Sequence, residues 1–467
     1  MAKGSSPSRG EAVLVSRQSK MAVMFPALIQ RLSSRPFRQT IYISLGIFLF
    51  CCSTVLSLMQ VRVDGIFTFI RSDGRAYYIY LPALFIGGNL DFSNELENPW
   101  NLHYHFLNPA DRTALGYINN KYPIGLALTI TPPFLVAHGI SKAVFAFTRW
   151  QWVEPNGYTV LYQLLCASFI MALGVLSMIF VDRLLTGRFR LDGDVVTLAV
   201  LAYWAGSHYV YYFFREPFMV HVVSGFWVTA SILLVDRIVS RLDQNGFFLR
   251  DWMLLTVSLS MALVCRSTNV FLFPFLLYLL YQLGQRRRLR RLLKFAPICL
   301  LGLVPLFIQM LVWHHTTGHF IFYSYGEEGF RWFQPELWKT LFSSRHGLFF
   351  WSPLVGFAIA GISLHIYRDG CLKNSFLCCY LLSFLMLWYF NSAWHMWWFG
   401  DAFGARAFLE LSSFFILGLS LFFKRIRQSS RLSKSIAVIG ILMCVGYNYL
   451  LMALYILSRI PRGDYLL

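Results

Sequence analysis

The chain has 467 residues, of which 57% are hydrophobic and only 13% are charged. Because a water-soluble domain carries about 25% charged residues, this composition excludes a soluble globular protein and indicates a membrane protein. The formal net charge of +19 lies in basic blocks at 1–39, 284–294 and 424–434, each beside an apolar segment. That distribution is typical of blocks that orient membrane helices, so we do not expect nucleic-acid binding.

Apolar segments of about 20 residues, the length needed to cross a bilayer, recur along the whole chain. In order they are 40–60, 122–147, 158–181, 193–214, 217–239, 295–313, 347–367, 375–392, 404–423 and 435–457. A further segment, 252–283, is interrupted by Arg266-Ser267-Thr268-Asn269 and forms either one broken span or a hairpin of two short helices. Together they predict an all-α polytopic membrane protein with about 11–13 transmembrane helices.

The basic blocks also predict how the chain is threaded through the membrane. The predicted units are a cytoplasmic tail at 1–39, a transmembrane module at 40–313 with an outer loop at 61–121, a second outer loop at 314–346, and C-terminal transmembrane helices at 347–467. A third outer segment is expected at 394–406, and the C-terminus is expected outside.

The middle of the chain fits two threadings. The sides of 148–157, 182–192 and 215–221 depend on whether 122–147 crosses once or turns back at Pro132-Pro133, and on whether 252–283 is a hairpin. Both arrangements agree with the basic blocks.

Neither a disulfide framework nor a metal site is indicated. Of the nine cysteines, all but Cys371 lie in apolar segments, and none forms a CxxC pair. His314, His315 and His319 lie close together, but one helix face would not present all three. We therefore expect no cofactor, with a divalent metal as the less favoured alternative.

The first outer loop carries an acid in a setting suited to catalysis. Asp73 lies between Arg71 and Arg75, so it is either a general base on a hydroxyl, with arginines for a phosphate, or a turn acid paired with a neighbour. Three tyrosines that offer stacking faces follow it: Tyr77, Tyr78 and Tyr80. Asp64 is the second choice for the base. Lys121, at the end of the loop, either faces a phosphate or snorkels to the interface.

Aromatic and charged residues alternate in the other two outer segments, which suits either a sugar-binding pocket or an interfacial aromatic belt with ion pairs. The residues concerned are Tyr325, Glu327, Glu328, Arg331 and Arg345, followed by Trp397, Trp398 and Arg406. Arg406 leads into an apolar segment, where a cation needs a partner or a task. It either holds a phosphate or pairs with Glu410 one turn later. His221 is of interest only if 215–221 faces outside.

Five stretches carry a resemblance to a known family. They are SDGRAYYIYLPAL (72–84), YPIGLALTITPPFLVAH (122–138), YSYGEEGFRW (323–332), LFSSRHGLFFWSP (341–353) and WWFGDAFGARAF (397–408). In their order, and with the basic tail and two large outer loops, they resemble the bacterial GT-C superfamily of membrane glycosyltransferases. This superfamily is related to protein O-mannosyltransferases and to the lipid A aminoarabinose transferase.

The resemblance implies transfer of a sugar, usually with inversion, from a polyprenyl-phosphate donor to a lipid, glycan or protein at the outer face of the bacterial inner membrane. Asp73 matches the acid that acts as base or orients the acceptor. The implied phosphate-binding residues are Arg406, Arg345, Lys121 and Arg75. The implied sugar and acceptor pocket comprises Tyr77, Tyr78, Tyr325, Glu327, Glu328, Arg331, Trp397, Trp398 and His221. Gly74 stands where several relatives have a second acid, which leaves the base assignment and a metal requirement open.

Two other functions use similar substrates. A glycan polymerase or ligase acting on lipid-linked oligosaccharides also places its site in a large outer loop. A transporter of lipid-linked sugars predicts internal pseudo-symmetry and charges near mid-membrane, and no inverted repeat is evident in the sequence.

Overall fold

The computed structural model describes residues 32, 34–64, 67–98, 107–242, 249–287, 297, 299–370 and 374–466. Across these residues the chain is helical, with two isolated bridges and no strand. Eight helices within the described ranges are long and apolar enough to cross a membrane. The predicted all-α polytopic membrane fold is therefore confirmed. The predicted tail 1–39 lies mostly outside the described residues.

The eight helices follow the chain in order. They are α2 (Arg35–Asp64), α6 (Gly125–Thr148), α7 (Val160–Arg188), α10 (His221–Arg241), η3 with α12 (Ser267–Gln285), α18 (Ser375–Ala393), η5 with α19 (Arg406–Arg427) and α20 (Arg431–Ile456). The predicted number of 11–13 also counted shorter helices as spans.

Those shorter helices come from expected spans that the structure divides or trims. They are α8 (Gly193–Gly206), α9 (Tyr209–Phe214), α11 (Leu249–Cys265), α14 (Val304–Thr317), α16 (Leu348–Trp351) and α17 (Leu354–Asp369). Pro353 separates α16 from α17, because a proline inside a helix removes one backbone hydrogen bond and clashes with the preceding turn. Part of 295–313 lies outside the described residues.

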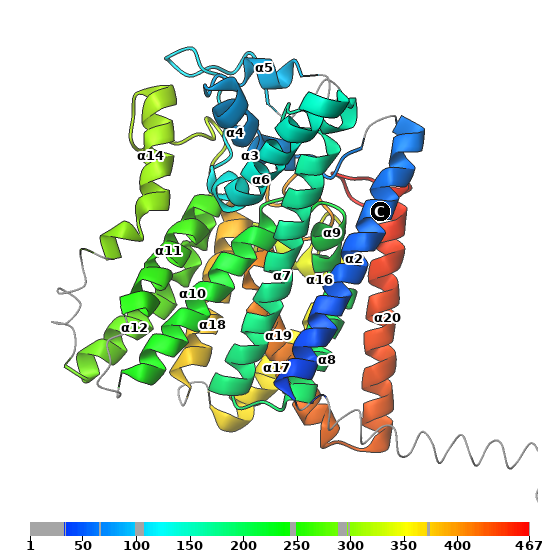
Figure 1. Ribbon diagram of the computed structural model, residues 1–467. Coiled ribbons are helices and arrows are strands. Elements are labelled where there is room, and N and C mark those ends of the chain that lie inside the picture. Colours follow the sequence, from blue (N-terminus) through cyan, green and yellow to red (C-terminus); the bar gives the residue numbers. More distant parts are fainter. Residues whose placement is uncertain are drawn as a thin grey trace, which may run out of the picture.

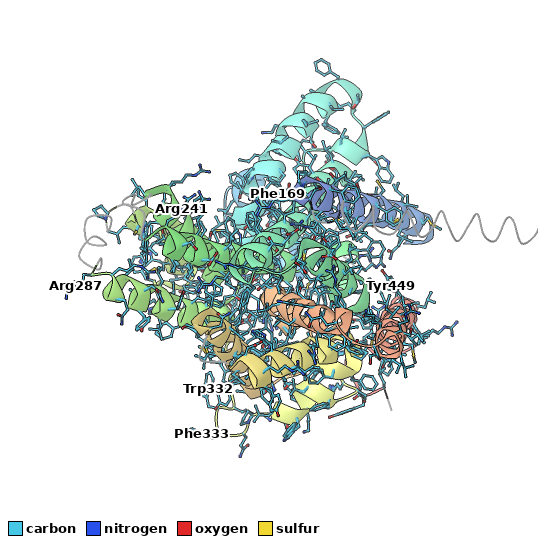
Figure 2. The ribbon with its side chains drawn as sticks, turned by 90° about the horizontal axis from the view of Figure 1, so that it is seen from below. Phe169, Arg241, Arg287, Trp332, Phe333 and Tyr449 are labelled. Carbon is cyan, nitrogen blue, oxygen red and sulfur yellow. The ribbon has the colours of Figure 1, made fainter. Side chains whose placement is uncertain are left out.

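The long helices form one bundle, and the irregular segments gather at one of its ends (Figure 1). There lie the short helices α3 (Gly74–Tyr78), α4 (Tyr80–Pro82) and α5 (Ser93–Leu96). This end is termed the site end. The opposite end, where α2 begins and α19 joins α20, is termed the basic end. Figure 2 looks along the bundle from the basic end, with Arg287 and Phe333 at its margin and side chains filling the space between the helices.

Contacts around α6 show that this helix begins and ends at the site end. The Tyr78 hydroxyl, at the end of α3, donates to the carbonyl of Gly157, which follows α6, at 2.6 Å. The rings of Tyr77 and Tyr122, the latter just before α6, lie 4.8 Å apart. Segment 122–147 therefore does not cross the bundle.

The segment 252–283 forms a hairpin, in which α11 runs toward the site end and α12 returns to the basic end (Figure 1). These findings select the threading in which 122–147 does not cross and 252–283 is a hairpin. Helix α6 is nevertheless continuous through Pro132 and Pro133 and does not turn back there. Segment 182–192 accordingly lies at the basic end. Segments 148–157 and 215–221 lie at the site end, which brings His221 to the predicted site.

We expect a β-carbon at Gly418 to destabilise the close crossing of α17 and α19. A Cβ there would lie 2.3 Å from the Ala358 carbonyl oxygen, and one at Gly361 would lie 2.1 Å from the Gly418 carbonyl oxygen. Small residues permit such backbone approach in membrane bundles. Gly418→Ala should cost about 1–3 kcal/mol, measured as a lower thermal unfolding temperature in detergent. Gly356→Ala, in α17 with open space around its Cβ, is the control. Equal unfolding temperatures for the two variants would contradict the prediction.

Candidate functional site

A cavity of about 440 Å³ lies at the site end, where the three loop segments meet. Its walls come from 72–77, 121–123, 323–330 and 390–401, together with the start of α10, the α11–η3 turn and Arg406. The loops are bonded to one another. The Ser324 hydroxyl donates to the Lys121 carbonyl at 2.9 Å, and the His395 amide donates to the Gly329 carbonyl at 2.9 Å. The three segments expected on one side of the membrane therefore enclose a common site.

The central feature of the cavity is an ion pair between Asp73 and Arg406. Asp73 directly precedes α3, and its Oδ2 accepts a hydrogen bond from Arg406 Nη2 at 2.9 Å instead of capping that helix. The Asp73 side chain is 31% exposed and that of Arg406 11% exposed. Arg406 Nη2 also donates to the Phe399 carbonyl at 3.0 Å. A half-buried carboxylate thus faces the cavity with a fixed orientation.

The alternative pairing of Arg406 with Glu410 is not formed. Residues Arg406–Leu411 adopt a 3₁₀ helix rather than an α-helix. With three residues per turn, side chains four apart point about 120° away from each other, whereas in an α-helix they are neighbours. Arg406 therefore reaches Asp73, and Glu410 turns to other partners.

Two further cations line the cavity. Lys121 pairs with Glu328, and its Nζ lies 5.8 Å from the centre of the Tyr122 ring and 5.6 Å from that of Tyr325. Arg266 Nε lies 3.4 Å from Glu410 Oε1. Each of the three cationic side chains thus faces a carboxylate, and an anionic ligand would compete with these carboxylates for the cations.

His221 and Glu410 lie beside Arg266 in the wall of the cavity. His221 is the first residue of α10, and its Nδ1 lies 2.8 Å from Glu410 Oε1. The His221 and Glu410 side chains are 2% and 1% exposed. The buried carboxylate is therefore held by one imidazole and one guanidinium.

The tyrosines of the site are neutral phenols. Burial raises the pKa of Tyr77 and of Tyr122 well above the usual value, and it raises the pKa of Tyr325 to about 12. The nearby Asp73 carboxylate adds to each of these shifts. Neutral phenols can donate hydrogen bonds and present ring faces, which suits a polyhydroxylated ligand.

The structure brings seven of the predicted site residues to the cavity. They are Asp73, Tyr77, Lys121, His221, Tyr325, Glu328 and Arg406. Arg266, Tyr122 and Asp401 also line it and were not predicted. The signal for Arg266 was a cation interrupting an apolar segment, a position that often marks function in membrane proteins.

Other predicted residues lie elsewhere. Arg345 stacks 3.7 Å from the centre of the Trp398 ring, and its Nε and Nη2 donate to the Gly463 carbonyl at 2.8 and 2.6 Å, so it ties the 394–406 segment to the chain after α20. Arg75 is buried beside the Thr68 hydroxyl. Trp397 is buried outside the cavity lining.

The remaining predicted residues lie on the surface, in the packing between helices or outside the described part of the chain. Glu327 and Arg331 are exposed. Tyr78 packs against Phe134 with its hydroxyl on Gly157, and the side chain of Asp64 lies outside the described residues. Among the described residues, no three His, Cys, Asp or Glu side chains are grouped to hold a metal ion, and cofactor independence stays a prediction.

No protein-family model, curated protein or solved structure matches this chain.

Proposed function

We propose that the protein is a membrane glycosyltransferase that moves a sugar from a polyprenyl-phosphate donor to an acceptor hydroxyl of a lipid, glycan or protein. The proposal places this reaction at the site end, on the outer face of the bacterial inner membrane. The observation that carries it is the Asp73 carboxylate, fixed by Arg406 in an aromatic, cation-bearing cavity among the loops. The resemblance of the sequence to GT-C enzymes supports the same function.

The chemistry of the cavity fits both substrates. A sugar can stack on Tyr122 or Tyr325, whose rings are partly exposed, and bond to the carboxylates. A donor phosphate can take up hydrogen bonds from Arg406 and Lys121. Cations lower the barrier most when they lie where the leaving phosphate gains negative charge, because this group is more negative in the transition state than in the ground state. Asp73 then binds the acceptor hydroxyl at hydrogen-bond distance.

We expect Asp73→Asn to abolish most sugar transfer. The amide keeps the size of the side chain and an acceptor for Arg406 but loses the charge, so transfer should fall about 100- to 10,000-fold. The measurement is consumption of radiolabelled polyprenyl-phosphate sugars by proteoliposomes containing the wild type or the variant. Asp91→Asn, in the same loop but outside the cavity, should keep wild-type activity.

Two outcomes would contradict the proposal. Equal turnover by wild type and Asp73→Asn would remove Asp73 from the reaction. If the wild type consumes no donor in a broad panel yet moves lipid-linked sugars across the bilayer, the protein is a transporter.

A further inference from the structure

A carboxylate and an imidazole form a bonded pair in the wall of the cavity. Nδ1 of His221 lies 2.8 Å from Oε1 of Glu410, and both side chains are almost fully enclosed by protein. The pair joins the start of α10 to η5, the 3₁₀ helix that also carries Arg406. An imidazole held by a carboxylate through one nitrogen is fixed in orientation and in tautomer.

The hydrogen-bond pattern determines where the lone pair of His221 lies. A carboxylate only accepts hydrogen bonds, so the bond to Glu410 requires the proton on Nδ1. Arg266 Nη1, 3.3 Å from Nδ1, cannot donate to a nitrogen that already bears hydrogen, and Arg266 instead shares the Glu410 carboxylate. In the neutral imidazole, the Nε2 atom of His221 therefore carries the lone pair.

The residue that carries this lone pair lines the cavity. His221 lines the cavity, and within the described residues its Nε2 has no hydrogen-bond partner but retains some exposure. His208 and His346 differ, because their Nε2 atoms are buried without a partner among the described residues. A lone pair that is oriented and unbonded, on a residue that lines the ligand space, is the arrangement of a general base.

We propose that His221, oriented by Glu410, accepts the proton of the acceptor hydroxyl, while Asp73 holds that hydroxyl in place. This inference rests on the proposed glycosyltransferase function. The acceptor oxygen bonds to the anomeric carbon, and the bond from that carbon to the phosphate oxygen breaks. The polyprenyl phosphate leaves with the electron pair, and the hydroxyl proton moves to Nε2 of His221.

Electrostatic interactions favour His221 rather than Asp73 as the group that accepts the proton of the acceptor hydroxyl. Asp73 Oδ2 is bonded to Arg406, and protonating Asp73 would leave that largely buried guanidinium without its counter-charge. Protonating His221 instead creates an imidazolium next to the Glu410 carboxylate. The new positive charge also arises as the leaving phosphate becomes more negative, so it stabilises the products.

The test compares His221→Asn with the wild type in proteoliposomes supplied with radiolabelled polyprenyl-phosphate sugars and with ethanol or trifluoroethanol as the acceptor. Asparagine can still donate to Glu410 but lacks the Nε2 base. Transfer to ethanol should fall about 100- to 10,000-fold. Transfer to trifluoroethanol should fall much less, because this more acidic alcohol needs less help from a base.

Two companion variants keep the test decisive. Glu410→Gln retains a hydrogen-bonding group but loses the charge, and it should show a smaller loss with the same dependence on acceptor acidity. His138→Asn is the matched control outside the cavity, where the histidine contacts the Tyr162 hydroxyl, and it should behave as wild type.

Other results would overturn the inference. Wild-type transfer to ethanol by His221→Asn, with Asp73→Asn inactive, assigns the proton to Asp73 and leaves the proposed function intact. If His221→Asn lowers transfer to ethanol and transfer to trifluoroethanol equally, His221 has a purely structural role. If the wild type consumes no donor with either alcohol or a broader acceptor panel, the proposed function fails and this inference fails with it.

Discussion

Arg406→Gln should lower sugar transfer about 100- to 1,000-fold, the effect of removing one preorganised donor from a developing anion. Arg406 is the most enclosed of the cavity's three cationic side chains, and it contacts both Asp73 and the Phe399 carbonyl. Its loss removes a phosphate ligand and also releases Asp73 from its fixed position. We expect a fall in maximal turnover together with weaker donor binding, measured as turnover of radiolabelled donor over a range of donor concentrations.

Two companion substitutions separate charge from geometry. Arg406→Lys keeps the charge but loses the planar fork that can hold Asp73 and a phosphate together, so its activity should lie between the wild type and Arg406→Gln. Arg112→Gln removes an exposed arginine that lies 3.5 Å from Asp91, and it should have no effect. A folded Arg406→Gln protein with the turnover of Arg112→Gln would rule out a role for Arg406 in the reaction.

Hydropathy located the long helices, because a bilayer requires long apolar segments whatever their packing. It could not decide the threading at 122–147 or 252–283, since one helix that crosses and one that stays at an end can have the same composition. The deciding facts are contacts between distant residues, such as the Tyr78 hydroxyl on Gly157. No local pattern in the sequence encodes such a contact.

The sequence predicted which residues belong to the site better than it predicted which of them pair with one another. Arg406 was identified because a charge beside an apolar segment is costly without a task, whereas Asp73 was identified because it lies between two arginines. The partners of these side chains depend on the local backbone conformation. The 3₁₀ helix that begins at Arg406 points the Arg406 side chain away from Glu410. Arg345 illustrates the same limit, because its bond to Gly463 spans 118 positions of the sequence.

Removing the carboxylate of Asp182 should destabilise the protein by about 3–5 kcal/mol, the usual cost of leaving one partner of a buried ion pair without the other. Helix α2 begins at Arg35, inside the predicted cytoplasmic tail, and this extension carries Arg38 into the bundle. Arg38 donates to both oxygens of Asp182 in α7 at 2.8 Å, and the two side chains are 4% and 2% exposed. The Tyr42 hydroxyl adds a bond to Asp182 at 3.3 Å. Asp182→Ala should therefore lower the thermal unfolding temperature strongly, measured in detergent on the purified protein.

A double substitution distinguishes the buried charge from the lost contact. Arg38→Met combined with Asp182→Leu removes both charges and refills the space, so it should be much more stable than Asp182→Ala. Asp192→Ala, which breaks an exposed pair with Arg427 at 3.4 Å, should cost less than about 1 kcal/mol. If Asp182→Ala unfolds at the same temperature as Asp192→Ala, the Arg38–Asp182 pair does not anchor α2 to α7. If the double variant is as unstable as Asp182→Ala, the cost lies in the lost hydrogen bonds rather than in an uncompensated arginine.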